Sequence, residues 1–282
     1  MRVEVNGARL WFEVDGAAFV PDGARMRARP TVVLIHGGPA SYDHSYLRAH
    51  FAPLAAVAQV VYLDLRGHGR SSRENVDAWS FEQCADDIAA FCDALEVDRP
   101  VVFGHSMGGW VVALYGARHP GHARSLILQS TAARWDMGRF SAAVERVAGP
   151  DIAELARRNF AGEPVTDDEW ARVYASAYGP NVPDAAELAR RVQNPDLGRR
   201  GLKLLRELDI VAELRRITSP TLVCVGDRDG ITPIAAAREL VNGLSPGIGR
   251  LEILEGAGHF AWLDMPDRYF RVLTSWLARL AG

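Results

Sequence analysis

The sequence predicts an α/β fold, a mostly parallel β-sheet with helices on both faces that is interrupted by a helical insertion. Short runs of Val, Ile and Leu recur along the chain, and each ends in Gly, Asp, His or Ser, which is typical of strands buried on both faces. Segments with helical spacing separate these runs, and this alternation implies a parallel sheet with right-handed crossovers. The alternation stops near residue 132 and resumes after residue 208. We therefore expect a core domain of 1–131 and 209–282 and a helical domain of 132–208.

The first two strands are expected at about 2–5 and 9–14, where apolar and polar residues alternate on either side of an Asn6-Gly7 turn. This pattern is typical of an antiparallel hairpin, which we place at one edge of the sheet. Buried strands are expected in six further segments, "TVVLIHGG" (31–38), "QVVYLDLRG" (59–67), "PVVFGHS" (100–106), "ARSLILQS" (123–130), "PTLVCVGD" (220–227) and "GRLEILEGAGH" (249–259).

The clearest helices are expected in 80–97 and 107–120. Ser80 begins the first as an N-cap, with Gln83 three residues later, and Pro120 stops the second. The segment between 132 and 208 contains no strand-like run. It carries short helical patterns punctuated by Gly and Pro, in "FSAAVERVAG", "DIAELARRNFAG", "DDEWARVYASAYG" and "DAAELARRVQN".

Composition excludes several classes of protein. With 282 residues, 48% of them hydrophobic, and a net charge of -3, the chain is an ordinary globular protein rather than a disordered, fibrous or nucleic-acid-binding one. No apolar run approaches the length needed to span a bilayer, so no membrane partner is expected. The N-terminus lacks a secretory signal, and we expect a cytoplasmic location. The three cysteines, Cys84, Cys92 and Cys224, are expected to be free buried thiols.

The stretch "GHSMGG" (104–109) lies directly between a predicted strand and a predicted helix. Its Gly-x-Ser-x-Gly pattern suits a strand that turns sharply into a helix, because the strained central residue needs small neighbours. Such a turn exposes the serine oxygen at the helix N-terminus. The pattern therefore predicts Ser106 as a nucleophile, and the alternative is a solvated serine in a glycine-rich turn.

A serine hydroxyl needs a nearby base, itself oriented by a third group. His259 is the candidate base, because it lies in a loop of small residues just after the last predicted strand, at the edge where Ser106 emerges. His105 adjoins Ser106 on a strand and should point to the other face, as a packed core imidazole. His44 and His50 are interpreted as surface or groove residues, and with His36 they form no convincing metal site.

The third group should be an acid that follows another strand, and "VGDRDGITP" offers two. Asp227 follows the strand directly, whereas Asp229 lies two residues further, where it can reach the imidazole, so we favour Asp229. The negative oxygen formed by serine attack also needs N–H donors. We expect these from the backbone of Met107 and of Gly38, in a "HGGPA" loop that Pro39 and Ala40 shape.

These segments together resemble the α/β-hydrolase family over the whole chain. The resemblance rests on "HGGPA", "DLRGHGRSS" (64–72), "GHSMGG", "GDRDGITP" and "GAGHFAWLDMP", which occur in the family's order. It implies an eight-stranded sheet, a cap domain over the active site and a triad of Ser106, Asp229 and His259. "HGGPA" looks like the "HGGPG" of proline iminopeptidases. The "GHSMGG" turn is more like those of esterases, lactonases and carbon–carbon bond hydrolases.

The expected function is a serine hydrolase, without metal or other cofactor, that cleaves a small carboxylic ester or lactone through an acyl-enzyme. Its partner would be a small molecule with an ester, lactone or amide carbonyl, and the protein would be a monomer or homodimer. Aromatic residues of the insertion could line the pocket or simply form its core: Trp135, Phe140, Phe160, Trp170, Tyr174 and Tyr178.

Two alternatives stay open. One is an aminopeptidase of the proline-iminopeptidase type, in which an acid such as Glu163, Asp167, Asp168 or Glu169 grips the substrate amine. The other is a hydrolase-shaped binding protein or receptor without turnover.

Overall fold

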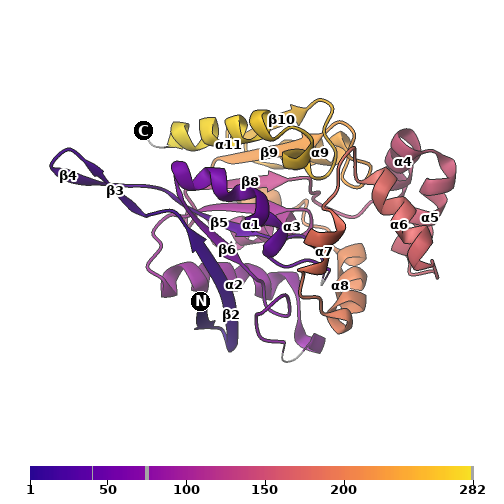
Figure 1. Ribbon diagram of the computed structural model, residues 1–282, viewed down its shortest axis with the longest axis horizontal. Coiled ribbons are helices and arrows are strands. Elements are labelled where there is room, and N and C mark those ends of the chain that lie inside the picture. Colours follow the sequence, from indigo (N-terminus) through magenta and orange to yellow (C-terminus); the bar gives the residue numbers. More distant parts are fainter. Residues whose placement is uncertain (40, 74–75, 281–282) are drawn as a thin grey trace.

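An eight-stranded β-sheet forms the centre of the protein, and the computed structural model describes residues 1–39, 41–73 and 76–280 (Figure 1). Across the sheet the strands follow the order β1 (Arg2–Val5), β2 (Ala8–Asp15), β6 (Gln59–Leu63), β5 (Thr31–Ile35), β7 (Val101–His105), β8 (Ser125–Gln129), β9 (Thr221–Gly226) and β10 (Gly249–Leu254). Strand β2 is antiparallel to both of its neighbours, and the other adjacent strands are parallel. The predicted fold class is therefore confirmed.

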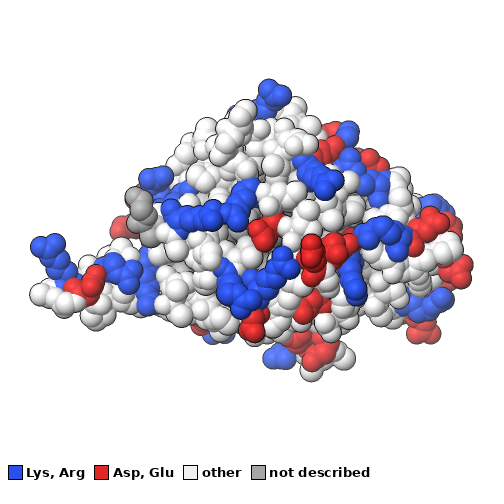
Figure 2. All heavy atoms as spheres, turned by 90° about the horizontal axis from the view of Figure 1, so that it is seen from above, with Lys and Arg blue, Asp and Glu red and all other residues white. Residues whose placement is uncertain are grey.

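Two hairpins precede the parallel strands. The predicted one joins β1 to β2 through Asn6 and Gly7, whose φ values of 48° and 71° are those of a tight Asn-Gly turn. The second, formed by β3 (Phe19–Asp22) and β4 (Arg25–Ala28), was not predicted. It is a separate two-stranded sheet that projects from the body of the protein (Figures 1 and 2).

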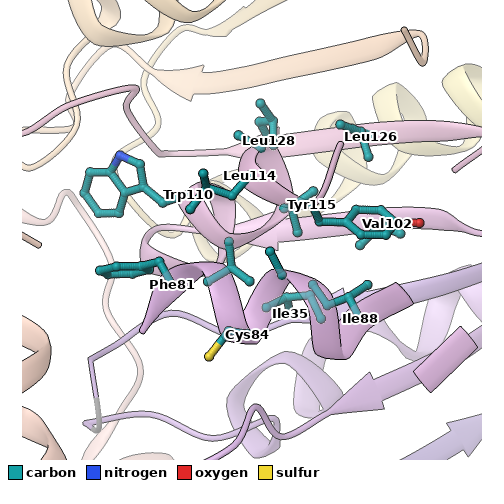
Figure 3. Packing of buried hydrophobic residues seen from close by; sticks show 14 of the residues in the cluster. Ile35, Phe81, Cys84, Ile88, Val102, Trp110, Leu114, Tyr115, Leu126 and Leu128 are labelled. Atoms are coloured by element: carbon teal, nitrogen blue, oxygen red, sulfur yellow. The ribbon is translucent and has the colours of Figure 1, made fainter. Parts of the chain in front are cut away.

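Alternate residues of the central strands face two separate cores. In β5, Val33 and Ile35 pack with α2 (Phe81–Ala94), α3 (Met107–Arg118) and α9 (Ile234–Gly243), whereas Val32 and Leu34 pack with α1 (Ser45–Phe51) and α11 (Pro266–Leu280). Figure 3 shows the first core, where side chains of α2 and α3 meet those of β5, β7 and β8. Helices thus cover both faces of the sheet. Strand β10 is only partly buried, contrary to expectation, because it is an edge strand.

The two clearest predicted helices are present. Ser80 caps α2 by accepting a hydrogen bond of 3.1 Å from the Gln83 N–H, while the Gln83 side chain turns to Asp87 instead of back to the cap. Helix α3 ends two residues before Pro120. The remaining short elements of the core are α10 (Ala261–Asp264) and the 3-10 helices η1 (Ala52–Ala56), η2 (Val76–Ala78) and η3 (Glu213–Arg216).

A helical insertion separates β8 from β9, as predicted. Its helices are α4 (Met137–Ala148), α5 (Pro150–Ala161), α6 (Asp167–Ala177), α7 (Ala185–Ala189) and α8 (Pro195–Glu207). Helices α4 to α6 share a small core of their own, around Phe140 and Phe160. The two ends of the insertion lie side by side, because Arg134 and Asp209 form an antiparallel bridge. The helices lie beyond one end of the sheet (Figure 1).

All three cysteines are buried and free, as expected. Within the described ranges, no helix combines the length and the apolar character required to cross a bilayer. On the face drawn in Figure 2, positive and negative side chains are interspersed.

Candidate active site

The chain turns sharply from β7 into α3 at Ser106. Ser106 has φ 53° and ψ -122°, a conformation that side-chain-bearing residues rarely adopt. Glycine neighbours make the turn sterically possible. A Cβ atom on Gly104 would lie 2.3 Å from the Gly108 carbonyl oxygen, and one on Gly108 would lie 2.4 Å from that of His36. The strain is thus maintained by close packing on both sides of the serine.

Asp229 and His259 form a buried pair. The His259 Nδ1 atom lies 2.9 Å from Asp229 Oδ2. Asp229 Oδ1 accepts hydrogen bonds of 2.8 Å from the backbone N–H groups of Ile231 and Thr232, and Oδ2 accepts one of 2.7 Å from the Thr232 hydroxyl. The carboxylate is therefore held by three donors besides the imidazole. With the Nδ1 proton donated to Asp229, the His259 Nε2 atom is the one that can accept a proton.

Asp227, the alternative acid, has another partner. Its Oδ1 atom accepts a hydrogen bond of 2.7 Å from the Gly256 N–H, which joins the loops that follow β9 and β10. Thr232 was not singled out in the sequence. The "DGIT" segment could have indicated it, since an Asp can accept hydrogen bonds from the backbone N–H groups two and three residues later.

The backbone N–H groups of Gly38 and of Met107, the residue after Ser106, have no acceptor among the described residues. The neighbouring Gly37 N–H is engaged, because it donates to the Tyr46 hydroxyl at 2.8 Å. Gly37 also lies against the turn at Ser106, where an added Cβ would approach Ser106 Cβ to 3.3 Å. Ala40, expected to help shape this loop, lies outside the described residues.

His105 is more than a packed core imidazole. Its Nδ1 atom bonds to the Tyr46 hydroxyl at 2.8 Å and its Nε2 atom bonds to the His259 carbonyl oxygen at 3.1 Å. Burial holds the pKa of His105 well below its usual range, so this imidazole is neutral. Since Tyr46 also binds Gly37, one buried chain of hydrogen bonds connects three loops, those that carry Gly38, Ser106 and His259.

Two other histidines have structural partners. His36 bonds through Nδ1 to the Gly37 carbonyl oxygen at 2.7 Å, and burial lowers its pKa. His44 is buried, and is therefore not the surface or groove residue that was expected. Its Nδ1 atom lies 2.8 Å from the buried carboxylate of Asp64. Among the described residues, no group of three His, Cys, Asp or Glu side chains is arranged to hold a metal ion.

A cavity of about 430 Å³ lies between the core and the insertion, and Ser106 and Gly38 form part of its wall. Of the predicted pocket residues, Trp135, Trp170 and Tyr174 line it, as do Phe160 and Tyr178. Phe140 does not line the cavity. The centre of its ring lies 5.0 Å from that of the Trp135 ring and 4.7 Å from that of the Phe160 ring, so Phe140 belongs to the core of the insertion.

The end of α6 is attached to the loops of both the acid and the histidine. The Gly230 N–H donates to the Ala177 carbonyl oxygen at 3.0 Å, and the His259 N–H donates to that of Tyr178. A Cβ atom on Gly258 would lie 2.3 Å from the Gly179 Cα, so the two segments are in close contact. The insertion therefore positions this pair as well as covering the cavity.

Comparisons with known proteins agree with this architecture. The sequence model of the family described as "alpha/beta hydrolase fold" matches residues 30–266. Proline iminopeptidase PfmaB of Pestalotiopsis fici is 27% identical over 292 residues, which cover 98% of this chain and 99% of the relative. Monoacylglycerol lipase of Mycolicibacterium smegmatis is 28% identical over 285 residues, which cover 97% of this chain and 94% of the relative.

A crystal structure of proline iminopeptidase from Mycobacterium smegmatis superposes with a TM-score of 0.80 at 23% identity, covering 99% of this chain and 98% of that one. At this identity the likeness establishes the fold alone.

Proposed function

The chain belongs to the alpha/beta hydrolase fold family, and from this premise we propose that it is a serine hydrolase that cleaves a small carboxylic ester or lactone. Ser106 is the nucleophile, His259 the general base and acid, and Asp229 the group that orients the imidazole. The observation that carries the proposal is the strained backbone of Ser106 at the wall of a 430 Å³ cavity. Strain of this kind persists where close packing maintains it, as it does at many active sites.

The proposed reaction has two steps. In the first, Ser106 Oγ attacks the carbonyl carbon while His259 Nε2 takes the hydroxyl proton, and the alcohol then leaves with that proton. In the second, His259 takes a proton from a water molecule as its oxygen attacks the acyl-enzyme, and His259 then gives that proton to Ser106 Oγ as the acid is released. The 2.9 Å contact with Asp229 supports this role, because a buried carboxylate stabilises the imidazolium formed in both steps.

Gly38 and Met107 are the proposed donors to the negatively charged oxygen. Both N–H groups lack acceptors among the described residues, whereas Gly37 is engaged by Tyr46. A single donor of this kind contributes about 10²- to 10³-fold to the rate.

The cavity favours an ester over a peptide with a free amino terminus. Such a peptide carries its amine one carbon from the scissile carbonyl, so an acid that binds the amine must lie close to Ser106. Among the described residues, Asp167 is the acidic one on the cavity wall. It begins α6, whereas Tyr178 at the other end packs 5.2 Å from the His259 ring. At 1.5 Å per residue, eleven residues of helix separate these positions by about 16 Å.

An aminopeptidase of the proline-iminopeptidase type is the second candidate. It is favoured by the "HGGPA" loop and by relatives such as PfmaB, whose name describes that activity. The lipase relative favours the ester reaction instead.

The test compares three substrates, 4-nitrophenyl butyrate, a small lactone and proline 4-nitroanilide, with the wild type and with Ser106→Ala. We expect the ester or the lactone to have the highest kcat/KM and Ser106→Ala to be inactive. A strong preference for the anilide would establish the second candidate. A wild type no faster than Ser106→Ala on all three would indicate a binding protein without turnover.

A further inference from the structure

Arg191 adds a positive charge to the wall of the cavity that Ser106 lines. It follows α7 in the segment that leads into α8 (Figure 1). A basic residue on the wall of a largely apolar cavity is expected to have either a structural partner or a ligand, because a partly buried charge without compensation is unfavourable.

The Arg191 guanidinium is held in place by neutral groups. Its Nε atom donates to the Leu188 carbonyl oxygen at 2.9 Å, and Nη1 donates to that of Ser41 at 3.0 Å. The guanidinium carbon lies 4.7 Å from the centre of the Tyr42 ring. These contacts fix its orientation and leave further N–H groups for a ligand, since a guanidinium has five. A group fixed in this way loses little entropy on binding.

No carboxylate compensates this charge within the described part of the chain, where Arg191 forms no ion pair. The acids of the neighbouring segments have other partners, and Asp184 accepts from the Glu187 N–H at 2.8 Å. Glu187 lies 2.6 Å from His50 Nε2, and Asp43 accepts from the Val192 N–H at 2.9 Å and pairs with Arg70.

The Tyr42 hydroxyl does not compensate the charge either. Burial raises its pKa to about 12, so the phenol is neutral at physiological pH.

The acid on the cavity wall lies away from Arg191. The guanidinium lies over the ring of Tyr42, and the Tyr42 hydroxyl is 2.6 Å from that of Tyr174 in the last turn of α6. Asp167 is at the first turn, seven residues earlier, or about 10 Å along the helix axis. The cavity thus has a positive end beside Tyr42 and Tyr174. Both tyrosines belong to the aromatic cluster that packs on Phe260, the residue next to His259.

We propose that Arg191 binds a carboxylate of the substrate, so that the enzyme acts on esters or lactones that carry a second, free carboxylate. This inference rests on the proposed hydrolase function. A guanidinium suits a carboxylate because its parallel N–H groups match the two oxygens, and such charge-assisted hydrogen bonds are about twice as strong as neutral ones.

Two substrate pairs test the inference. In one, 4-nitrophenyl hemiglutarate, with its carboxylate on the acyl part, is compared with its methyl ester. In the other, 4-acetoxybenzoate, with its carboxylate on the alcohol part, is compared with methyl 4-acetoxybenzoate. We expect the wild type to favour the charged member of at least one pair by about 10-fold or more in kcat/KM. A preference for the neutral member of both pairs would overturn the inference.

The variant Arg191→Met should lower the charged-to-neutral ratio of kcat/KM by about 10-fold or more. Arg190→Met is the matched control. Arg190 is exposed, does not line the cavity and hydrogen-bonds to the Ala186 carbonyl oxygen, so its loss should leave the ratio unchanged. A structural role of Arg191 would lower the kcat/KM of both members equally and leave the ratio as it is, which would contradict the proposal.

A binding measurement separates failure of this inference from failure of the hydrolase proposal. Glutarate should bind Ser106→Ala in calorimetry and should bind the double variant Ser106→Ala/Arg191→Met at least about 10-fold more weakly. If neither ester pair is hydrolysed but this difference in glutarate binding is found, the hydrolase proposal fails and the Arg191 site stands. If the members of both pairs are hydrolysed without a charge preference and glutarate binds both variants equally, the hydrolase proposal stands and the Arg191 inference fails.

Discussion

Asp229 Oδ2 lies 2.9 Å from His259 Nδ1, and neither side chain is exposed to solvent. The carboxylate also accepts three hydrogen bonds from Ile231 and Thr232, which leave it little freedom to rotate. A buried acid in this position favours one tautomer of the imidazole and stabilises its charged form. The first two predictions concern this pair and the threonine that supports it.

Replacing Asp229 should affect catalysis far more than replacing Asp227. We expect Asp229→Asn to lower kcat on an aryl ester by about 10³- to 10⁴-fold, because the amide no longer favours the productive tautomer. Asp227→Asn should retain activity within about 10-fold, since Asp227 binds the Gly256 N–H instead of His259. Steady-state kinetics of the two variants would contradict this assignment if Asp227→Asn were the more damaging.

Thr232 should act as a positioning residue through Asp229. Thr232→Val removes the hydroxyl that donates to Asp229 Oδ2 at 2.7 Å and keeps the shape of the side chain. A hydrogen bond to a charged group contributes about 1.5–3 kcal/mol, so we expect kcat to fall by about 10- to 100-fold with little change in KM. Thr232→Ser, which retains a hydroxyl, should recover most of the lost rate. A loss in Thr232→Ser as large as that in Thr232→Val would show that a hydroxyl alone does not restore the rate, which would contradict this role of the hydrogen bond.

Tyr46→Phe should destabilise the protein. It leaves the buried Gly37 N–H and His105 Nδ1 without their partner, and each unsatisfied group costs about 1–3 kcal/mol. We expect the free energy of unfolding in urea to fall by about 2–6 kcal/mol, with a loss of kcat.

The matched control for Tyr46→Phe is Tyr269→Phe, because the Tyr269 hydroxyl is buried without a hydrogen-bond partner among the described residues. It should leave stability unchanged or slightly raised. Similar losses in the two variants would show that the Tyr46 hydrogen bonds contribute little.

His44 should make stability depend on pH. Burial alone would lower its pKa, but the hydrogen bond and charge of Asp64, with Asp43 and Glu13, raise the pKa above its ordinary value of 6.5. A raised pKa in the folded state adds stability that is fully present below pH 6.5 and is lost as the pH rises through the folded pKa. The free energy of unfolding of the wild type should therefore be higher than that of His44→Gln, and this difference should be larger at pH 5.5 than at pH 9. A difference that is constant or grows with pH would contradict this pairing.

Much of the fold could be predicted from the sequence because buried parallel strands leave a strong local pattern. The β3–β4 hairpin was missed because its residues are largely exposed and form no apolar run, although its turn contains an Asp22-Gly23 pair. The partial exposure of β10 depends on its place at the edge of the sheet, which the residues of the strand do not reveal.

Some features of the candidate site could not be predicted from local sequence patterns. Asp229 and His259 follow the ends of neighbouring parallel strands, so their contact could be anticipated from the topology of a parallel sheet. The roles of Tyr46 and His105 depend on contacts between segments 59 and 154 residues apart. Phe140 and Trp170 both lie on amphipathic helices of the insertion, and the packing of α4 to α6 decides that Trp170 faces the cavity while Phe140 does not.

Labelling of the nucleophile tests the central claim most directly. The protein is treated with a fluorophosphonate and examined by intact-mass spectrometry and peptide mapping. Ser130→Ala is the control, because Ser130 also has a positive φ, of 47°, but is buried and accepts a hydrogen bond from Gln129 at 2.9 Å. We predict one adduct, on Ser106, in wild type and in Ser130→Ala, and none in Ser106→Ala. An adduct on another residue, or equal labelling of wild type and Ser106→Ala, would contradict the account.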